Sequence, residues 1–236
     1  LPARLPYMRQ LLLDLLPETP PSLDNFVAGC NGEALAGLTN WLSPDNREAS
    51  LLLWGEGGAG KTHLLQASGA AYHDALADPD IAAIEAELLA DNPGKPRFHA
   101  VDNVEALSAS GQIVLFNLYN RIRAAAGRLL TAAFLPPVQL DLREDLRTRL
   151  GQGLIYRIHA LTDDQMLDAL RAYAAARRLR LPPESFDYLF ARAPRDMRSL
   201  MDLLGALDRY SLEHKRAITL PLLREVLMTP AELQSS

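Results

Sequence analysis

The segment 55–62, which reads GEGGAGKT, constrains the fold of this chain more than any other feature. It fits the pattern G-x-x-x-x-G-K-[ST], in which glycines let backbone N–H groups surround a phosphate at a helix N-terminus. The apolar run 51–54 before it predicts a buried strand, and residues 63–67 after it open a helical pattern. Because strand, loop and helix come in that order, the segment predicts a phosphate-binding P-loop rather than an ordinary glycine-rich turn.

The residues of this loop have distinct expected roles. Lys61 can reach the β- and γ-phosphates of a nucleotide, and the Thr62 hydroxyl can hold Mg²⁺. We therefore expect ADP or ATP to be bound by the loop and the residue that follows it, namely Gly55, Glu56, Gly57, Gly58, Ala59, Gly60, Lys61, Thr62 and His63.

Composition narrows the function classes. The chain has 236 residues, 48% of them hydrophobic, which suffices for one large domain or a medium domain plus a small one. The formal net charge of −5 argues against a protein that wraps nucleic acid directly, because duplex affinity depends on neutralised phosphates. The single cysteine, Cys30, excludes an internal disulfide, and we expect it to be buried. We expect no membrane association, because no stretch approaches the length of a span. Residues 1–7 precede Met8, which looks like a natural start, and are left out of the fold prediction.

Strands and helices alternate through the first two thirds of the chain. We expect helices at 31–41, from the P-loop to about residue 72, at 113–125 and at 140–149, and strands at 51–54, 98–101 and 129–133. Residues 81–89 fit a helix but could also hide a short edge strand. Alternation of this kind predicts a parallel sheet covered on both faces, with ligands at the carboxyl ends of the strands.

From Thr162 onward the pattern predicts helices only. Thr162 and Gln165 form a capping box for a helix to about residue 177, and a second helix starts at Pro182. A third helix, from about residue 197, has one apolar face, and Thr219 caps a fourth. The expected fold class is therefore α/β, a P-loop parallel-sheet domain followed by a small all-helical bundle.

Two residues at the end of the second predicted strand bear on hydrolysis. Asp102 is the candidate carboxylate that holds Mg²⁺ through water, with a turn or N-cap aspartate as the alternative. Asn103 stands where many such ATPases have a second acid. An amide can orient the attacking water but cannot take its proton, so we expect weak intrinsic hydrolysis at most. Near the end of the third strand, where a γ-phosphate sensor is expected, only Thr131 is polar.

Two arginines are candidates for contacts with phosphates. Arg149 follows the third strand and its helix, where an arginine finger that reaches a neighbour's nucleotide is expected. Its alternative role is a solvated pair with Glu144 or Asp145. Arg198 begins the third helix of the bundle and can swing over bound phosphates, although Arg195 is close enough to compete for that role.

The segment 10–15 reads QLLLDL and suits a peptide that enters a hydrophobic pocket on another protein. Gln10 would be the polar anchor, and Leu13 and Leu15 the apolar side chains. An amphipathic piece folded onto the protein's own surface fits the spacing equally well.

Taken together, these segments resemble the DnaA-related AAA+ proteins, and within them the Hda-type regulatory inactivators of the replication initiator DnaA. The likeness runs from Gln10 to about Leu227 and rests on QLLLDL at 10–15, WGEGGAGKTHLL at 54–65, VDNVE at 101–105, FNLYNRI at 116–122, RL at 149–150 before IY at 155–156, and RDMRSL at 195–200. The resemblance implies a clamp-binding tail and connector over 8–22, an AAA+ nucleotide-binding domain over 23–160 and a helical lid over 161–230.

The resemblance also implies a regulator rather than a motor. Its tail would bind the sliding clamp of DNA polymerase through Gln10, Leu13 and Leu15. The protein, preferably ADP-bound, would stimulate ATP hydrolysis on DnaA through Arg149 in trans, so that origins do not refire, and Arg198 would be the lid sensor. Self-association is left open, and any DNA contact would be indirect or weak. The protein would be located in the bacterial cytoplasm and would associate with the nucleoid through the clamp. Phe134 replaces the polar residue that family members tend to have near the end of the third strand.

Two other classes of function remain open. A stand-alone AAA+ ATPase of the helicase- or clamp-loader type would turn ATP over rapidly, which Asn103 argues against. A DNA-binding initiator would need a basic recognition element, which the net charge of −5 does not favour.

Overall fold

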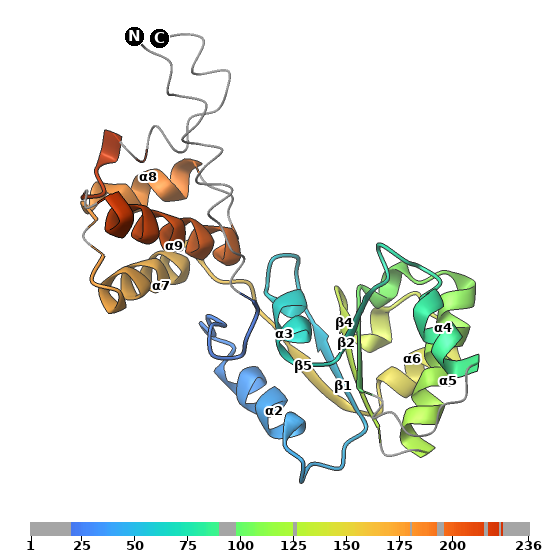
Figure 1. Cartoon of the computed structure of the whole chain (residues 1–236). Helices are drawn as coiled ribbons and strands as arrows, with labels where there is room; N and C mark the ends of the chain where they lie inside the picture. The colour runs from blue at the N-terminus through green and yellow to red at the C-terminus, as the bar shows by residue number, and fades with distance from the viewer. Residues whose placement is uncertain are drawn as a thin grey trace, which may run out of the picture. The chain divides into compact units, whose positions relative to one another are not determined.

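The computed structural model of the chain describes residues 20–89, 98–124, 127–179, 181–192, 196–214, 217–221 and 223. These residues belong to two compact units, Pro20–Ala160 and the part from Leu161 onward (Figure 1). The first unit is α/β and the second contains only helices among its described residues. The predicted fold class is confirmed.

A five-stranded parallel sheet with the order β2-β3-β4-β1-β5 forms the centre of the first unit. In chain order the unit contains α2 (Gly32–Leu42), β1 (Ser50–Trp54), α3 (Lys61–Ala67), β2 (Ala71–Asp74), α4 (Ala82–Leu89), β3 (Phe98–Asp102), the 3₁₀ turn η1 (Val104–Ala106), α5 (Ala109–Ala124), β4 (Arg128–Ala133), the 3₁₀ turn η2 (Pro137–Gln139), α6 (Glu144–Leu150) and β5 (Leu154–Arg157).

Helices cover both faces of this sheet, with α2 and α3 on one face and α4, α5 and α6 on the other (Figure 1). Successive side chains of a strand point to opposite faces, so Leu51 and Leu53 pack under α2 and α3 whereas Leu52 packs under the other layer. Burial on both faces explains why residues 51–54 of β1 are a continuous apolar run. Each leucine buried in this way contributes about 1.5–3 kcal/mol to folding.

The prediction of one helix from the P-loop to about residue 72 is wrong. Helix α3 ends at Ala67, where Ser68 closes it through a backbone bond to Leu65 and Gly69 has a φ of +78°. The chain then enters β2, the edge strand that pairs with β3. Four residues are too few to show strand alternation in the sequence, and only the pairing with β3 defines this strand. The open question at 81–89 is settled in favour of a helix, α4.

Other element boundaries differ from the sequence prediction. Strand β5 was not expected, α5 begins at Ala109 rather than 113, and α6 begins at Glu144 rather than 140. The late start of α6 follows from the two prolines at 136–137, which lead into η2 and an extended Leu140 instead of a helix. Cys30 is exposed, in the turn before α2, and the expectation that it is buried is wrong.

The helical unit contains α7 (Asp163–Ala176), α8 (Glu184–Arg192) and α9 (Met197–His214). The predicted capping box is present, because the Thr162 side chain accepts from the Gln165 N–H at 3.2 Å and the Gln165 side chain accepts from the Thr162 N–H at 3.0 Å. Apolar side chains of the three helices, among them Leu170, Leu189 and Leu204, form a core separate from the two cores of the sheet unit. Residues 220, 221 and 223 are helical, and the rest of the predicted fourth helix lies outside the described residues.

The predicted tail residues Gln10, Leu13 and Leu15 lie outside the described residues, as does Arg195. Among the helices that are described, none is long and apolar enough to span a bilayer.

Candidate functional site

The P-loop follows the carboxyl end of β1, an inner strand of the sheet, where the Gly55 N–H donates to the Ala133 carbonyl of β4 at 3.2 Å. Gly58 and Gly60 have φ angles of +75° and +95°, a backbone conformation that side chains disfavour. A Cβ added to Gly60 would also lie 2.7 Å from the Phe26 ring. Glycine is therefore required at positions 58 and 60 by the path of the loop. The N–H groups of Gly55 and Ala59 already have carbonyl partners, and those of the other loop residues can face a phosphate.

Lys61, the first residue of α3, points its ammonium group back into the loop. Its Nζ donates to the carbonyl oxygens of Gly55 at 2.6 Å and Glu56 at 2.9 Å. An ammonium has three donors, so one N–H remains for a ligand. Burial lowers the pKa of Lys61, and the negative charges of Asp102, Glu105 and Glu56 oppose that shift.

Asp102 ends β3 beside this lysine, as the sequence predicted, and is 1% exposed. Its Oδ2 accepts from the Thr62 hydroxyl at 2.5 Å and from the Tyr72 hydroxyl at 3.1 Å, and its Oδ1 accepts from the Asn103 N–H at 2.9 Å. Burial and the adjacent Asp102 carboxylate raise the pKa of Tyr72, so that its hydroxyl stays protonated and donates. The structure thus brings together the two predicted Mg²⁺ oxygens, on Thr62 and Asp102.

Asn103 has a left-handed backbone, with φ +54°, and turns its side chain toward β2. Its Nδ2 donates to Asp74 Oδ1 at 2.9 Å. A carboxylate can only accept, so this contact fixes the amide orientation and leaves Asn103 Oδ1 as the group that can accept from a water. The predicted water-orienting role stays a prediction, and Asp74 is a partner that the sequence analysis missed because β2 was missed.

Glu105 is a second acid near the P-loop that the sequence analysis did not single out. It lies on η1, is exposed, and contributes a negative charge at Lys61. Its Oε1 accepts from the Phe134 N–H at 3.1 Å, which ties it to the end of β4. The sequence signal that could have identified Glu105 is its position three residues after Asp102. The sequence analysis considered only the position adjacent to Asp102 for a second acid.

Thr131, the polar residue considered as a γ-phosphate sensor, lies in the middle of β4 and pairs with Leu52 and Val101. It is 2% exposed, and its neighbours Leu129 and Ala133 on the same face pack toward α4, α5 and α6, away from α3. Phe134, which follows the strand, is 51% exposed and brings no polar side chain to the end of β4.

His63, on the first turn of α3, joins the N-terminal part of this unit to the P-loop helix. Its Nε2 lies 2.9 Å from the Ser22 carbonyl oxygen, and its ring centroid is 5.7 Å from that of Phe26. These contacts place the segment 22–26 beside the loop.

The residues present fit a nucleotide with Mg²⁺. The loop supplies a glycine cradle and a cationic Lys61, which suit a phosphate chain. Thr62 and Asp102 supply two oxygens, and Mg²⁺ bound to phosphates characteristically uses one or two protein oxygens plus phosphate and water. Within the described residues, no group of three or more His, Cys, Asp or Glu forms an all-protein metal cage.

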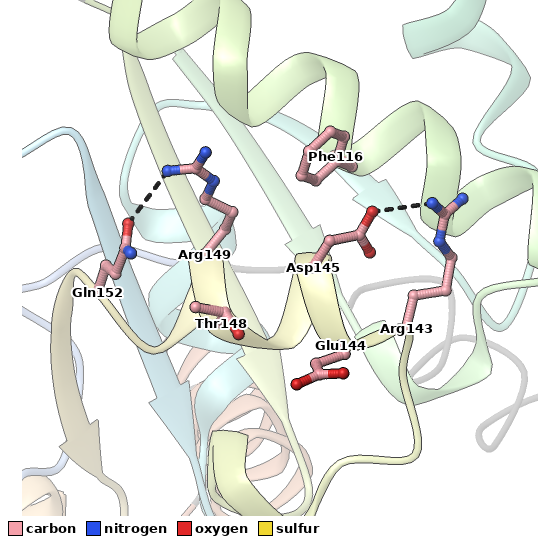
Figure 2. A pocket seen from close by; sticks show the side chains of 7 residues that line it. All are labelled: Phe116, Arg143, Glu144, Asp145, Thr148, Arg149 and Gln152. Carbon is pink, nitrogen blue, oxygen red and sulfur yellow. Dashed lines mark hydrogen bonds and ion pairs between the residues drawn. The ribbon is translucent and has the colours of Figure 1, made fainter.

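A second candidate surface lies on α5 and α6, around Arg149 (Figure 2). It is an open depression lined by Phe116, Arg143, Glu144, Asp145, Thr148, Arg149 and Gln152. Arg149 is half-buried, lies 5.9 Å from the Tyr119 ring centroid and donates to Gln152 Oε1 at 3.4 Å. Asp145 is instead paired with Arg143 at 2.8 Å, so the alternative pairing of Arg149 with Asp145 is not what the structure shows.

The sheet separates Arg149 from its own P-loop helix. Helix α6 belongs to the layer with α4 and α5, whereas α3 lies on the other face (Figure 1). This placement is compatible with a contact in trans. Arg198, the second residue of α9, belongs to the helical unit, and its role as a lid sensor stays a prediction.

Comparisons with known proteins agree with this architecture. Residues 163–227 match the family model described as the lid domain of Hda. Domain III of the replication initiation protein DnaA from Thermotoga maritima is similar in fold, with a TM-score of 0.65 and 18% identity over 87% of this chain and 95% of that chain.

Two further structures share the fold. The AMPPCP-bound DnaA from Aquifex aeolicus has a TM-score of 0.60 and 23% identity, over 83% of this chain and 69% of that chain. The RuvB Holliday junction branch migration motor from Thermotoga maritima has a TM-score of 0.60 and 15% identity, over 93% of this chain and 78% of that chain. The α/β unit thus has the AAA+ fold, and the helical unit that follows it matches the Hda lid. Over residues 163–227 the chain is thus similar to the lid domain of Hda, and its fold is similar to that of DnaA domain III.

Proposed function

We propose that this chain is a nucleotide-binding regulator that couples the DNA polymerase sliding clamp to DnaA and stimulates hydrolysis of DnaA-bound ATP. Its activity would prevent re-initiation of replication. The observation that carries the proposal is the placement of Arg149 on the α5 and α6 surface, on the opposite face of the sheet from α3 and unpaired with the nearby acids.

The contacts of Arg149 support a role in trans. Its guanidinium lies over the Tyr119 ring and near the neutral Gln152 amide, and neither contact neutralises its charge. The open depression around it leaves the side chain accessible to a partner (Figure 2). A partner's triphosphate would meet a charged, preoriented donor, and an arginine supplied in trans stabilises the charge that develops during phosphoryl transfer.

The geometry of the P-loop supports the proposal that ADP or ATP is bound there, with Mg²⁺ held by Thr62 and Asp102. The similar DnaA of Aquifex aeolicus is AMPPCP-bound, which agrees with nucleotide binding by this chain. Bound ligand would stabilise the α/β unit and prepare it for the partner.

The surroundings of the loop favour a regulator over a motor. Asn103 cannot take a proton from water, and Phe134 provides no polar side chain at the end of β4. We therefore expect weak ATPase activity of its own at most. In this proposal Arg198 senses the nucleotide from the lid, and Gln10, Leu13 and Leu15 bind the clamp, which would bring a cytoplasmic protein to the nucleoid.

The test is Arg149→Ala, assayed by single-turnover hydrolysis of labelled ATP on DnaA in the presence of clamp-loaded DNA. We expect the variant to keep its nucleotide and its clamp binding but to lose stimulation on the order of 10³-fold or more. Arg143→Ala is the matched control, because it removes an arginine of the same surface that is already paired with Asp145. Wild-type stimulation by Arg149→Ala would show that Arg149 does not act in trans and is only a surface residue of its helix.

A stand-alone ATPase is the alternative, and Glu105 is the observation that favours it. This carboxylate lies close enough to Lys61 to influence its pKa and could take the proton that Asn103 cannot. Rapid ATP turnover by the purified chain, abolished by Glu105→Gln, would support this alternative against the regulator.

A further inference from the structure

Tyr72 is the residue of edge strand β2 that reaches into the nucleotide site. It pairs with Ala100 of β3, and Asp102 lies two residues further along that strand, on the same face. The tyrosine side chain is long enough to reach this diagonal neighbour, and its hydroxyl donates to Asp102 Oδ2 at 3.1 Å.

The Asp102 carboxylate is held by donors from three parts of the α/β unit. Thr62 of α3 and Tyr72 of β2 both donate to Oδ2, and the Asn103 N–H donates to Oδ1. A carboxylate that is 1% exposed needs such donors, because a buried charge without hydrogen-bond partners is costly. Thr62 and Asn103 belong to segments that adjoin the P-loop and β3, so Tyr72 is the contribution of the edge strand.

We propose that Tyr72 is a positioning residue for Mg²⁺, whose hydroxyl holds the Asp102 carboxylate in the orientation that turns it, together with the Thr62 hydroxyl, toward the cation. The inference rests on the nucleotide and Mg²⁺ site of the proposed function. Partners of metal-binding groups orient those groups, and their removal typically lowers metal affinity by roughly 10- to 100-fold.

The hydroxyl can be separated from the packing of the ring. The Tyr72 ring is half-buried and packs against the core under α2 and α3, which Phe in its place would preserve. Tyr72→Phe therefore removes one oxygen and leaves the apolar contacts. Tyr156→Phe is the matched control, because its hydroxyl lies beside Gly37 of α2, and the hydrogen bonds that the described residues donate to the Asp102 side chain come from Thr62, Tyr72 and Asn103 instead.

The experiment measures ADP affinity of the full chain by calorimetry in EDTA and over a Mg²⁺ titration. For Tyr72→Phe we expect an affinity in EDTA within about twofold of wild type and a Mg²⁺ midpoint raised about tenfold or more. Tyr156→Phe should match wild type in both conditions, and equal melting temperatures would show that each variant is folded.

Three results would overturn the inference. A Mg²⁺ midpoint in Tyr72→Phe equal to wild type would show that the hydroxyl does not position Asp102, while leaving the nucleotide site intact. An equal loss of affinity in EDTA and in Mg²⁺ would make Tyr72 a structural residue only. Absence of ADP binding by the wild type in both conditions would defeat the proposed nucleotide site itself and this inference with it.

Discussion

Replacing Lys61 by Ala tests the foundation of the nucleotide site. The Lys61 ammonium donates to two loop carbonyls and keeps one N–H for a phosphate. In Lys61→Ala the Glu56 carbonyl can bond to water because Glu56 is exposed, and the carbonyl of the buried Gly55 can bond to water only through the space that the half-buried Lys61 side chain vacates. The substitution leaves the glycines that allow the positive φ angles of the loop and the bond from Gly55 to Ala133, so we expect the fold to survive.

The expected loss of ADP affinity in Lys61→Ala follows from the charge and burial of Lys61. Two unit charges about 4 Å apart interact by about 4 kcal/mol at an effective dielectric constant of about 20. Solvent screening at a half-buried group reduces this to about 3 kcal/mol, and each 1.4 kcal/mol corresponds to about a factor of 10 in affinity. The lysine is already partly desolvated in the folded chain, as its lowered pKa indicates, so little of the gain is spent on dehydrating it. We therefore expect ADP affinity to fall by roughly 100-fold or more.

The assay is isothermal titration calorimetry with ADP, together with the melting temperature of each variant. Arg143→Ala is the control, since it removes a cation that is paired on the α6 surface and not at the P-loop. Unchanged ADP affinity in a folded Lys61→Ala protein would refute the assignment of the loop as a phosphate site and remove the basis of the proposed function.

Three further predictions concern the pH dependence, the lid and the tail. Because burial lowers the pKa of Lys61 below the ordinary value of 10.5, ADP affinity should fall as the pH rises through that lowered pKa, and an affinity that stays constant up to pH 10.5 would contradict this. Thr162→Ala removes the cap of α7, which is worth about 1 kcal/mol, so amide hydrogen exchange in the first turn of α7 should accelerate about fivefold, whereas unchanged exchange would show that the capping box does not stabilise this turn. Leu13→Ala combined with Leu15→Ala should eliminate binding to the purified sliding clamp without an appreciable change in melting temperature, and unfolding of this variant would instead mark the tail as a packing element.

The fold class was accessible from the sequence because its main signals are local. Strand β1, the P-loop and α3 follow one another within residues 50–67, and the capping box of α7 spans four residues. The two short strands β2 and β5 were not predicted, because neither contains enough residues to show alternation. Their existence depends on hydrogen bonds to β3 and β1, which the sequence does not display.

The candidate site divides in the same way. The sequence by itself determined the loop, Lys61, Thr62 and Asp102, since motif spacing and a strand that ends in a carboxylate can be read along the chain. The tertiary structure decided their partners: Tyr72 on Asp102, Asp74 on Asn103, Glu105 on the backbone of Phe134, and Tyr119 under Arg149. Each of these contacts joins elements about 30 residues apart, and it forms because the sheet register and helix packing bring those elements together. Side-chain identity alone cannot specify such contacts, because the residues that meet are determined by strand order and pleat rather than by distance along the chain.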